Sequence, residues 1–143
     1  MAATWIVVAE NSRARIFAMD NKKAPLQELA DLVHPEGRSH GRELSSDRPG
    51  RTFDSKGRGR HAKEANVNVK QQEAINFAKK IAEYVESART HRDFDKLILI
   101  AAPEFLGMLR KNLSAASKQL ITKEVNKNIV QKDSASIRKH LMD

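Results

Sequence analysis

The sequence predicts an α/β fold, a mixed five-stranded sheet with helices on its faces. Two continuous apolar runs, at residues 5–9 and 97–102, have the composition of strands buried on both faces. Between them, a three-and-four apolar spacing over residues 74–88 predicts a long amphipathic helix. Because a helix that leads into a buried strand is half of a crossover connection, we expect the second apolar run to lie parallel to the first.

The first part of the chain predicts a β-meander. Trp5–Ala9 is followed by turn residues and then by a second strand-like segment at residues 14–19, which is typical of a hairpin. Pro25 ends a polar break, and Leu26–Val33 has an apolar spacing that fits either a helix or a strand. Since the two turns lie so close together, we predict a third antiparallel strand.

The amphipathic helix is the clearest single element of the sequence. Its apolar stripe predicts a helix of about twenty residues. Asn66 or Asn68 is the expected N-cap, because a short polar side chain can accept from the first backbone N–H groups. The spacing places Glu83 and Glu86 on the solvent-facing side.

The rest of the chain predicts short elements around the parallel strand. Pro103 can begin a helix, and residues 114–120 predict a second short one. Residues 121–130 predict an edge strand whose charged side chains protect it from further pairing. Asp133 or Ser134 caps a last helix. The resulting order of strands and helices is the outline of the ribonuclease H-like folds.

A basic loop at about residues 35–67 interrupts the apolar pattern. Residues 38–61 contain six arginines, one lysine and two histidines against three acids, which supplies +4 of the net charge of +8. Such a tract buries too little apolar surface to offset its ordering entropy, so we predict a long flexible loop within a single domain, residues 1–143. The clustered positive charge favours a polyanionic partner.

The residues that metal sites and enzymes use are not arranged for either role. The chain has no cysteine, its five histidines lack close metal-ligand spacing, and its acids do not gather at strand centres as two-metal nucleases require. No nucleophile elbow or dinucleotide fingerprint occurs. We therefore expect a non-enzymatic protein with no metal, cofactor or small-molecule ligand.

The distribution of apolar residues also bears on location. No stretch approaches the ~20 apolar residues of a membrane-spanning helix, and the N-terminus lacks the basic region of a signal peptide. The absence of cysteine suits a reducing compartment. We expect a cytoplasmic protein that does not contact the membrane.

The candidate contact residues lie in the basic loop. Arginine pairs with phosphates through two hydrogen bonds or stacks on exposed bases, and glycine lets the backbone bend around an irregular partner. A plain solvated loop is the alternative. The predicted nucleic-acid contacts are Arg48, Arg51, Lys56, Arg58, Arg60 and His61, and the predicted loop hinges are Gly57 and Gly59.

Several stretches together carry a family resemblance. They are WIVVAENSRARIF at residues 5–17, HPEGR at 34–38, SDRPGRTFDSKGRGRHA at 46–62 and APEFLGMLRKNL at 102–113. These stretches resemble the bacterial family called "protein required for attachment to host cells". That family is in turn similar to the central domain of archaeal and eukaryotic-type peptide-chain release factors, which implies the same sheet order and an active loop between the meander and the long helix.

The resemblance also implies where this chain departs from the release factors. Their loop bears Gly-Gly-Gln, which promotes peptidyl-tRNA hydrolysis in the ribosome. Here residues 57–61 read GRGRH, so the double glycine is broken, no glutamine is adjacent, and Gln71 and Gln72 follow ten residues later. Gly59 alone is carried over.

Three functions remain open from the sequence. The leading hypothesis is a non-enzymatic protein that contacts ribosomal RNA or tRNA through its basic loop. The second is a release-factor-like peptidyl-tRNA hydrolase in which His61 or a water held by the loop replaces the glutamine. The third takes the family name literally and predicts a factor that affects attachment to host cells, directly or indirectly.

Overall fold

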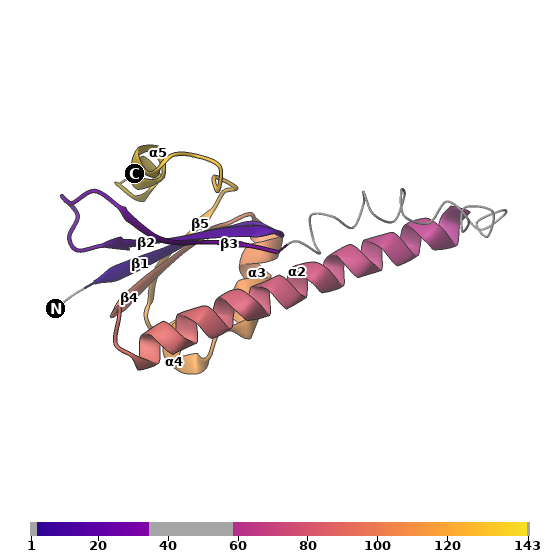
Figure 1. The fold of residues 1–143 in the computed structure, drawn as a ribbon, viewed down its shortest axis with the longest axis horizontal. Coiled ribbons are helices and arrows are strands. Elements are labelled where there is room, and N and C mark those ends of the chain that lie inside the picture. Colours follow the sequence, from indigo (N-terminus) through magenta and orange to yellow (C-terminus); the bar gives the residue numbers. More distant parts are fainter. Residues whose placement is uncertain (1–2, 35–58, 143) are drawn as a thin grey trace.

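The predicted α/β architecture is confirmed by the computed structural model, which describes residues 3–34 and 59–142 and, for residues 59–67, the backbone alone. One five-stranded sheet, in the order β3-β2-β1-β4-β5, lies between two layers of helices (Figure 1). The strands are β1 (Thr4–Ala9), β2 (Arg13–Met19), β3 (Gln27–Val33), β4 (Lys96–Ala101) and β5 (Ile121–Asn126); the helices are α2 (Gly59–Thr90), α3 (Pro103–Asn112), α4 (Ala115–Gln119) and α5 (Ser134–Met142).

The strand pairing has both predicted parts, a meander and a parallel crossover. β1 pairs antiparallel with β2 and parallel with β4, and β3 continues the meander on the outer side of β2. β5 pairs parallel with β4 and forms the other edge. All residues from Trp5 to Ala9 are buried, which explains the continuous apolar run of this central strand. The ambiguous spacing of residues 26–33 belongs to an edge strand, where most positions remain exposed.

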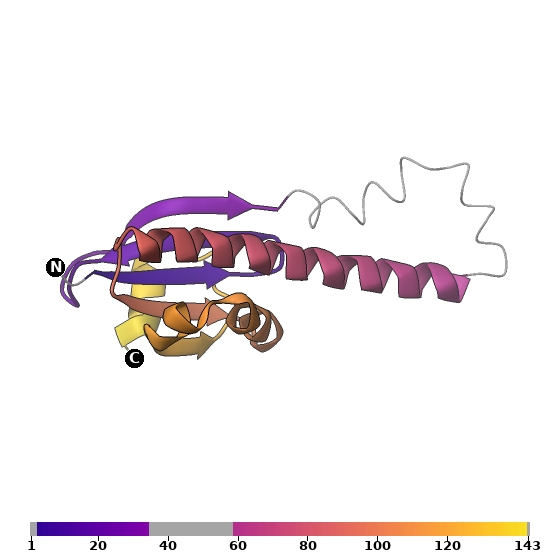
Figure 2. The ribbon, with the colours of Figure 1, turned by 90° about the horizontal axis from the view of Figure 1, so that it is seen from below.

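Two hydrophobic layers hold the helices to the sheet. Successive side chains of a strand point to opposite faces. Val7 therefore packs in the layer under α2 and α3, together with Phe77 and Phe105, whereas Ile6 packs in the layer under α5, together with Ile137. α2, α3 and α4 thus cover one face, and α5 covers the other (Figures 1 and 2).

α2 begins earlier than the sequence pattern predicts. It has 32 residues, which corresponds to about 48 Å of helix. The expected start at Asn66 or Asn68 is wrong, and residues 59–67 belong to the helix and not to a loop. Residues 62–65, with the sequence AKEA, explain this extension, because alanine, lysine and glutamate favour the helix without any apolar stripe.

The extra turns of α2 lie outside the packed body. Among the residues whose side chains are described, Ala74 is the first buried position of this helix. The N-terminal half of α2 therefore projects past the end of the sheet (Figures 1 and 2). We call residues 59–73 the helical arm.

The short helices begin at the residues that the sequence indicates. Pro103 is the first residue of α3. Ser114 Oγ accepts from the backbone N–H of Ser117 at 3.1 Å and caps α4. Asp133 Oδ1 accepts from the backbone N–H of Ser136 at 2.8 Å at the start of α5. This last bond lowers the pKa of Asp133, because it stabilises the ionised carboxylate.

Candidate nucleic-acid interface

The helical arm leaves the body at one end of the sheet. β3 is parallel to β1, since both are antiparallel to β2. The C-terminal ends of β1 and β3 therefore lie at the same end of the sheet. His34 follows β3 there and contacts Glu73 of α2. This contact marks the base of the arm.

The predicted contact residues are divided between two parts of the chain. Of the six predicted contacts and two predicted hinges, five residues lie outside the described residues: Arg48, Arg51, Lys56, Gly57 and Arg58. Gly59, Arg60 and His61 form the first turn of α2. The role of Gly59 as a hinge stays a prediction, now at the start of this helix. A helical backbone in this turn holds Arg60 and His61 at the tip of the arm, continuous with the basic segment.

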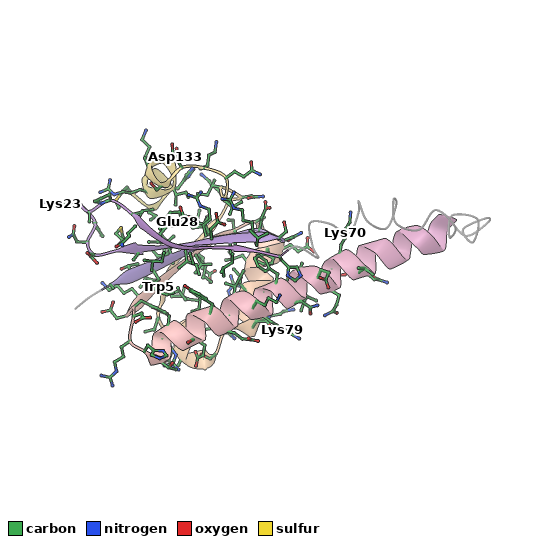
Figure 3. All side chains as sticks on the ribbon, viewed as in Figure 1. Trp5, Lys23, Glu28, Lys70, Lys79 and Asp133 are labelled. Atoms are coloured by element: carbon green, nitrogen blue, oxygen red, sulfur yellow. The ribbon has the colours of Figure 1, made fainter. Side chains whose placement is uncertain are left out.

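Exposed polar residues on the arm were not among the predicted contacts. Asn68, Lys70, Gln71 and Gln72 are all exposed, and Figure 3 shows Lys70 on the projecting half of the helix. Between Glu64 and Glu73, residues 65–72 contain no aspartate or glutamate, so this stretch itself contributes no negative charge. In the sequence, the only indication of this surface is that residues 65–72 contain four side-chain amides and no acid.

A hydrogen-bonded chain connects the arm to a buried histidine. His34 is 3% exposed, and its ring stacks on Phe77 with the ring centroids 5.3 Å apart. Its Nε2 lies 2.9 Å from Glu73 Oε2, and it must carry the hydrogen because a carboxylate only accepts. The other carboxylate oxygen accepts from Asn76 Nδ2 at 3.3 Å, and Asn76 Oδ1 accepts from Gln72 Nε2 at 3.0 Å. The sequence gives no sign of this chain, because His34 and Glu73 come from different elements.

Glu86 has a partner that the helical spacing did not predict. Glu83 is exposed as expected. Glu86, however, accepts hydrogen bonds from Arg89 and from the hydroxyls of Ser114 and Ser117, at 2.7 to 2.9 Å. These donors, Arg89 first, lower the pKa of Glu86 to about 2. The charged carboxylate therefore joins α2 to α4 at neutral pH.

Within the described residues there is neither a cluster of metal ligands nor a membrane-spanning helix. No group of three or more histidine, aspartate or glutamate side chains is placed there to hold a metal ion. None of the helices in these residues is long and apolar enough to cross a membrane, α2 included.

Comparison with known families assigns the chain to one of them. The model of the family described as "Protein required for attachment to host cells" matches residues 5–141. The chain belongs to this family. A further relative is the uncharacterized protein RP470 of Rickettsia prowazekii (strain Madrid E), which is 31% identical over 70 residues. That match covers 48% of this chain and 47% of the relative, so it spans about half of each.

Solved structures with the same fold come from archaeal proteins. One is described as an archaeal protein, with a TM-score of 0.54 and 15% identity, covering 99% of this chain and 33% of the other. Another is the archaeal translation termination factor aRF1, with a TM-score of 0.51 and 14% identity, covering 98% of this chain and 38% of the other. At such identity the likeness concerns the fold alone, and this family member spans 33% of the first protein and 38% of the second.

Proposed function

We propose that this member of the host-attachment family is a non-enzymatic RNA-binding protein that contacts ribosomal RNA or tRNA on the ribosome. The observation that carries the proposal is the helical arm, which extends from the body and is continuous with the basic segment of residues 38–61. An arm of about fifteen residues has a length of about 22 Å. It can therefore enter a groove or a gap between RNA helices that the body cannot enter.

Charge supports the same partner. Half of the net charge of +8 comes from residues 38–61, and the arm continues from them with an acid-free stretch at residues 65–72. Arginine and lysine that neutralise phosphates release condensed counterions, so binding of this kind weakens steeply as salt is raised. The likeness of the fold to aRF1 favours the ribosome as the source of the RNA.

Ribosome co-sedimentation at several salt concentrations tests the proposal. An Arg58→Ala/Arg60→Ala variant removes two of the predicted phosphate contacts, and a Lys127→Ala/Lys139→Ala variant removes two exposed cations near the opposite layer. We expect the first variant to lower affinity and to flatten the log–log salt slope by about 1.4–1.8, at roughly 0.7–0.9 for each lost contact. The control variant should behave as wild type.

Two results contradict the proposal. The first is the absence of wild-type protein from the ribosome pellet even at low salt. The second is an equal salt slope in wild type and in the Arg58→Ala/Arg60→Ala variant, which would remove these arginines as contacts.

One observation favours a hydrolytic alternative. Residues 35–58 connect β3 to α2, which is where the resemblance to release factors places their active loop. The alternative predicts release of labelled peptide from peptidyl-tRNA on ribosomes, and loss of that release in Gly59→Ala and His61→Ala. Peptide release that these variants abolish would replace the non-enzymatic function, and release at the background rate would exclude the alternative.

A further inference from the structure

We propose that Gln72 recognises an unpaired RNA base, with a preference for adenine, on RNA that the helical arm holds. The inference rests on the proposed function and adds a specific readout to it. Arginine contacts to phosphate are indifferent to sequence, whereas hydrogen bonds to base edges carry sequence information. Gln72 is exposed on the arm, and a hydrogen bond to Asn76 restrains its side chain.

The orientation of Gln72 is set from inside the protein. The hydrogen-bonded chain runs from the buried His34 through Glu73 and Asn76 to Gln72, with donor–acceptor distances of 2.9, 3.3 and 3.0 Å. His34 is itself held against Phe77. A surface glutamine normally loses considerable side-chain freedom when it binds a partner, and an amide that is already held loses less.

The chain leaves Gln72 with a suitable pair of groups. Its side-chain nitrogen has two hydrogens, and one of them is donated to Asn76 Oδ1. One N–H and the amide oxygen remain, and neither has a hydrogen bond to another described residue. One donor beside one acceptor is the pattern with which glutamine binds adenine at N7 and N6. In RNA, such edges are accessible on bases that are unpaired.

The surroundings of Gln72 suit RNA better than a protein partner. The side chain is exposed on the arm, next to the exposed Gln71 and one helical turn from Asn68. Lys70 supplies a cation on the same projecting segment (Figure 3). No acidic residue occurs between residues 65 and 72, and among the described side chains of residues 68–72 there is no exposed large hydrophobic one to bind a hydrophobic peptide.

Fluorescence anisotropy with short single-stranded oligoadenylate and oligouridylate provides the test. Wild type should bind oligoadenylate about tenfold or more tightly, which is the discrimination expected of one bidentate pair. Gln72→Ala should bind both RNAs equally and keep the salt slope of wild type, because no phosphate contact is lost. Lys70→Ala should keep the preference and flatten the slope. The matched control is Gln131→Ala, an exposed glutamine outside the arm.

Variants of Glu73 separate positioning from a general loss of structure. Glu73→Ala breaks the chain and should reduce the preference for oligoadenylate, although Glu73 does not contact the RNA. Glu73→Gln keeps the size of the side chain but only one acceptor oxygen, so its NH2 group meets a donor at either His34 or Asn76, and the preference should fall as in Glu73→Ala. Far-ultraviolet circular dichroism establishes that each variant keeps its helix, because a Gln–Asn pair four residues apart also stabilises a helix slightly.

Each outcome bears on the inference. Equal affinity of wild type for the two RNAs, or an unchanged preference in Gln72→Ala, overturns base recognition by Gln72 and leaves RNA binding intact. Absence of binding to either RNA and to ribosomes overturns the proposed function itself. A preference that disappears in Gln72→Ala, falls in both Glu73 variants while their helix is intact, and persists in Gln131→Ala supports the inference.

Discussion

Arg15 of β2 connects three parts of the fold and allows a quantitative test. Its guanidinium makes two hydrogen bonds to the carboxylate of Glu28 on β3, at 2.9 and 3.1 Å. It also donates to the carbonyl oxygens of Val130 and Lys132, which precede α5. The guanidinium lies 5.0 Å from the centroid of the Phe17 ring, and the side chain is 11% exposed.

Arg13, two residues earlier, is a matched control. It makes the same two-bond contact with Asp31 on β3. Its side chain is 34% exposed, however, and that of Asp31 is 41% exposed. The hydrogen bonds raise the pKa of Arg13 and lower that of Asp31, but a pair this accessible to water contributes less than about 1 kcal/mol to folding.

The difference between the two arginines sets the expected magnitude. Arg15→Ala leaves two carbonyl oxygens and a carboxylate without their donor. Hydrogen bonds to a charged group contribute about 1.5–3 kcal/mol where they are shielded, and the partial exposure of Glu28 reduces its share. We expect Arg15→Ala to lower the free energy of unfolding by about 2–3 kcal/mol, a fall in Tm of roughly 6–12 °C.

Urea denaturation and thermal melting of the two alanine variants measure this difference. Arg15→Lys should be intermediate, because lysine keeps the charge and loses the planar two-bond contact. Equal losses for Arg15→Ala and Arg13→Ala would refute the reasoning, since both remove a cation paired across the same two strands and only burial and the two carbonyl bonds distinguish them.

Three further predictions concern single side chains. Wild type should be more stable than Glu86→Gln at neutral pH, and the difference should disappear as pH falls from 4.5 through about 2, because the folded-state pKa of Glu86 is lowered; a constant difference in acid unfolding would contradict this. Phe77→Ala, at a ring that is 1% exposed, should cost about 3–5 kcal/mol in urea denaturation, and a loss no larger than that of the exposed Tyr84→Ala would contradict the assigned core. Asp133→Ala should lower the thermal midpoint at neutral pH because the α5 cap is lost, whereas Asp133→Asn should keep the midpoint near that of wild type. The difference between wild type and Asp133→Ala should shrink as pH falls toward the lowered pKa of the Asp133 carboxylate. Equal midpoints for the two variants would contradict the capping role.

The elements with strong local patterns were predicted well from the sequence. The runs at residues 5–9 and 97–102 are apolar at every position because β1 and β4 are buried on both faces, and their short length and β-branched residues favoured strands over helices. The starts of the short helices near Pro103, Ser114 and Asp133 were equally readable, since a helix start depends on the few residues next to it. The parallel pairing of β1 and β4 followed from the helix between them.

The errors arose where no apolar pattern was available. The start of α2 was placed at Asn66 or Asn68, shortly before the amphipathic stripe begins. Residues with favourable helix propensity extend the helix toward the N-terminus without any apolar stripe. Glu86 was assigned to the solvent side from its spacing, although α4 brings two hydroxyls to it. The predicted contacts at Arg48, Arg51, Lys56 and Arg58 lie outside the described residues and stay predictions.

By itself, the sequence determined the class of the fold, the order of its elements and the position of its basic segment, because these depend on local periodicity, turn residues and charge. Only the tertiary structure decided how far α2 projects and that His34, 39 residues away from Glu73 in the chain, orients an exposed amide through it. A hydrogen bond between distant elements leaves no periodic trace in either segment. It exists because the packing of Phe77 against the sheet brings β3 and α2 to the same point.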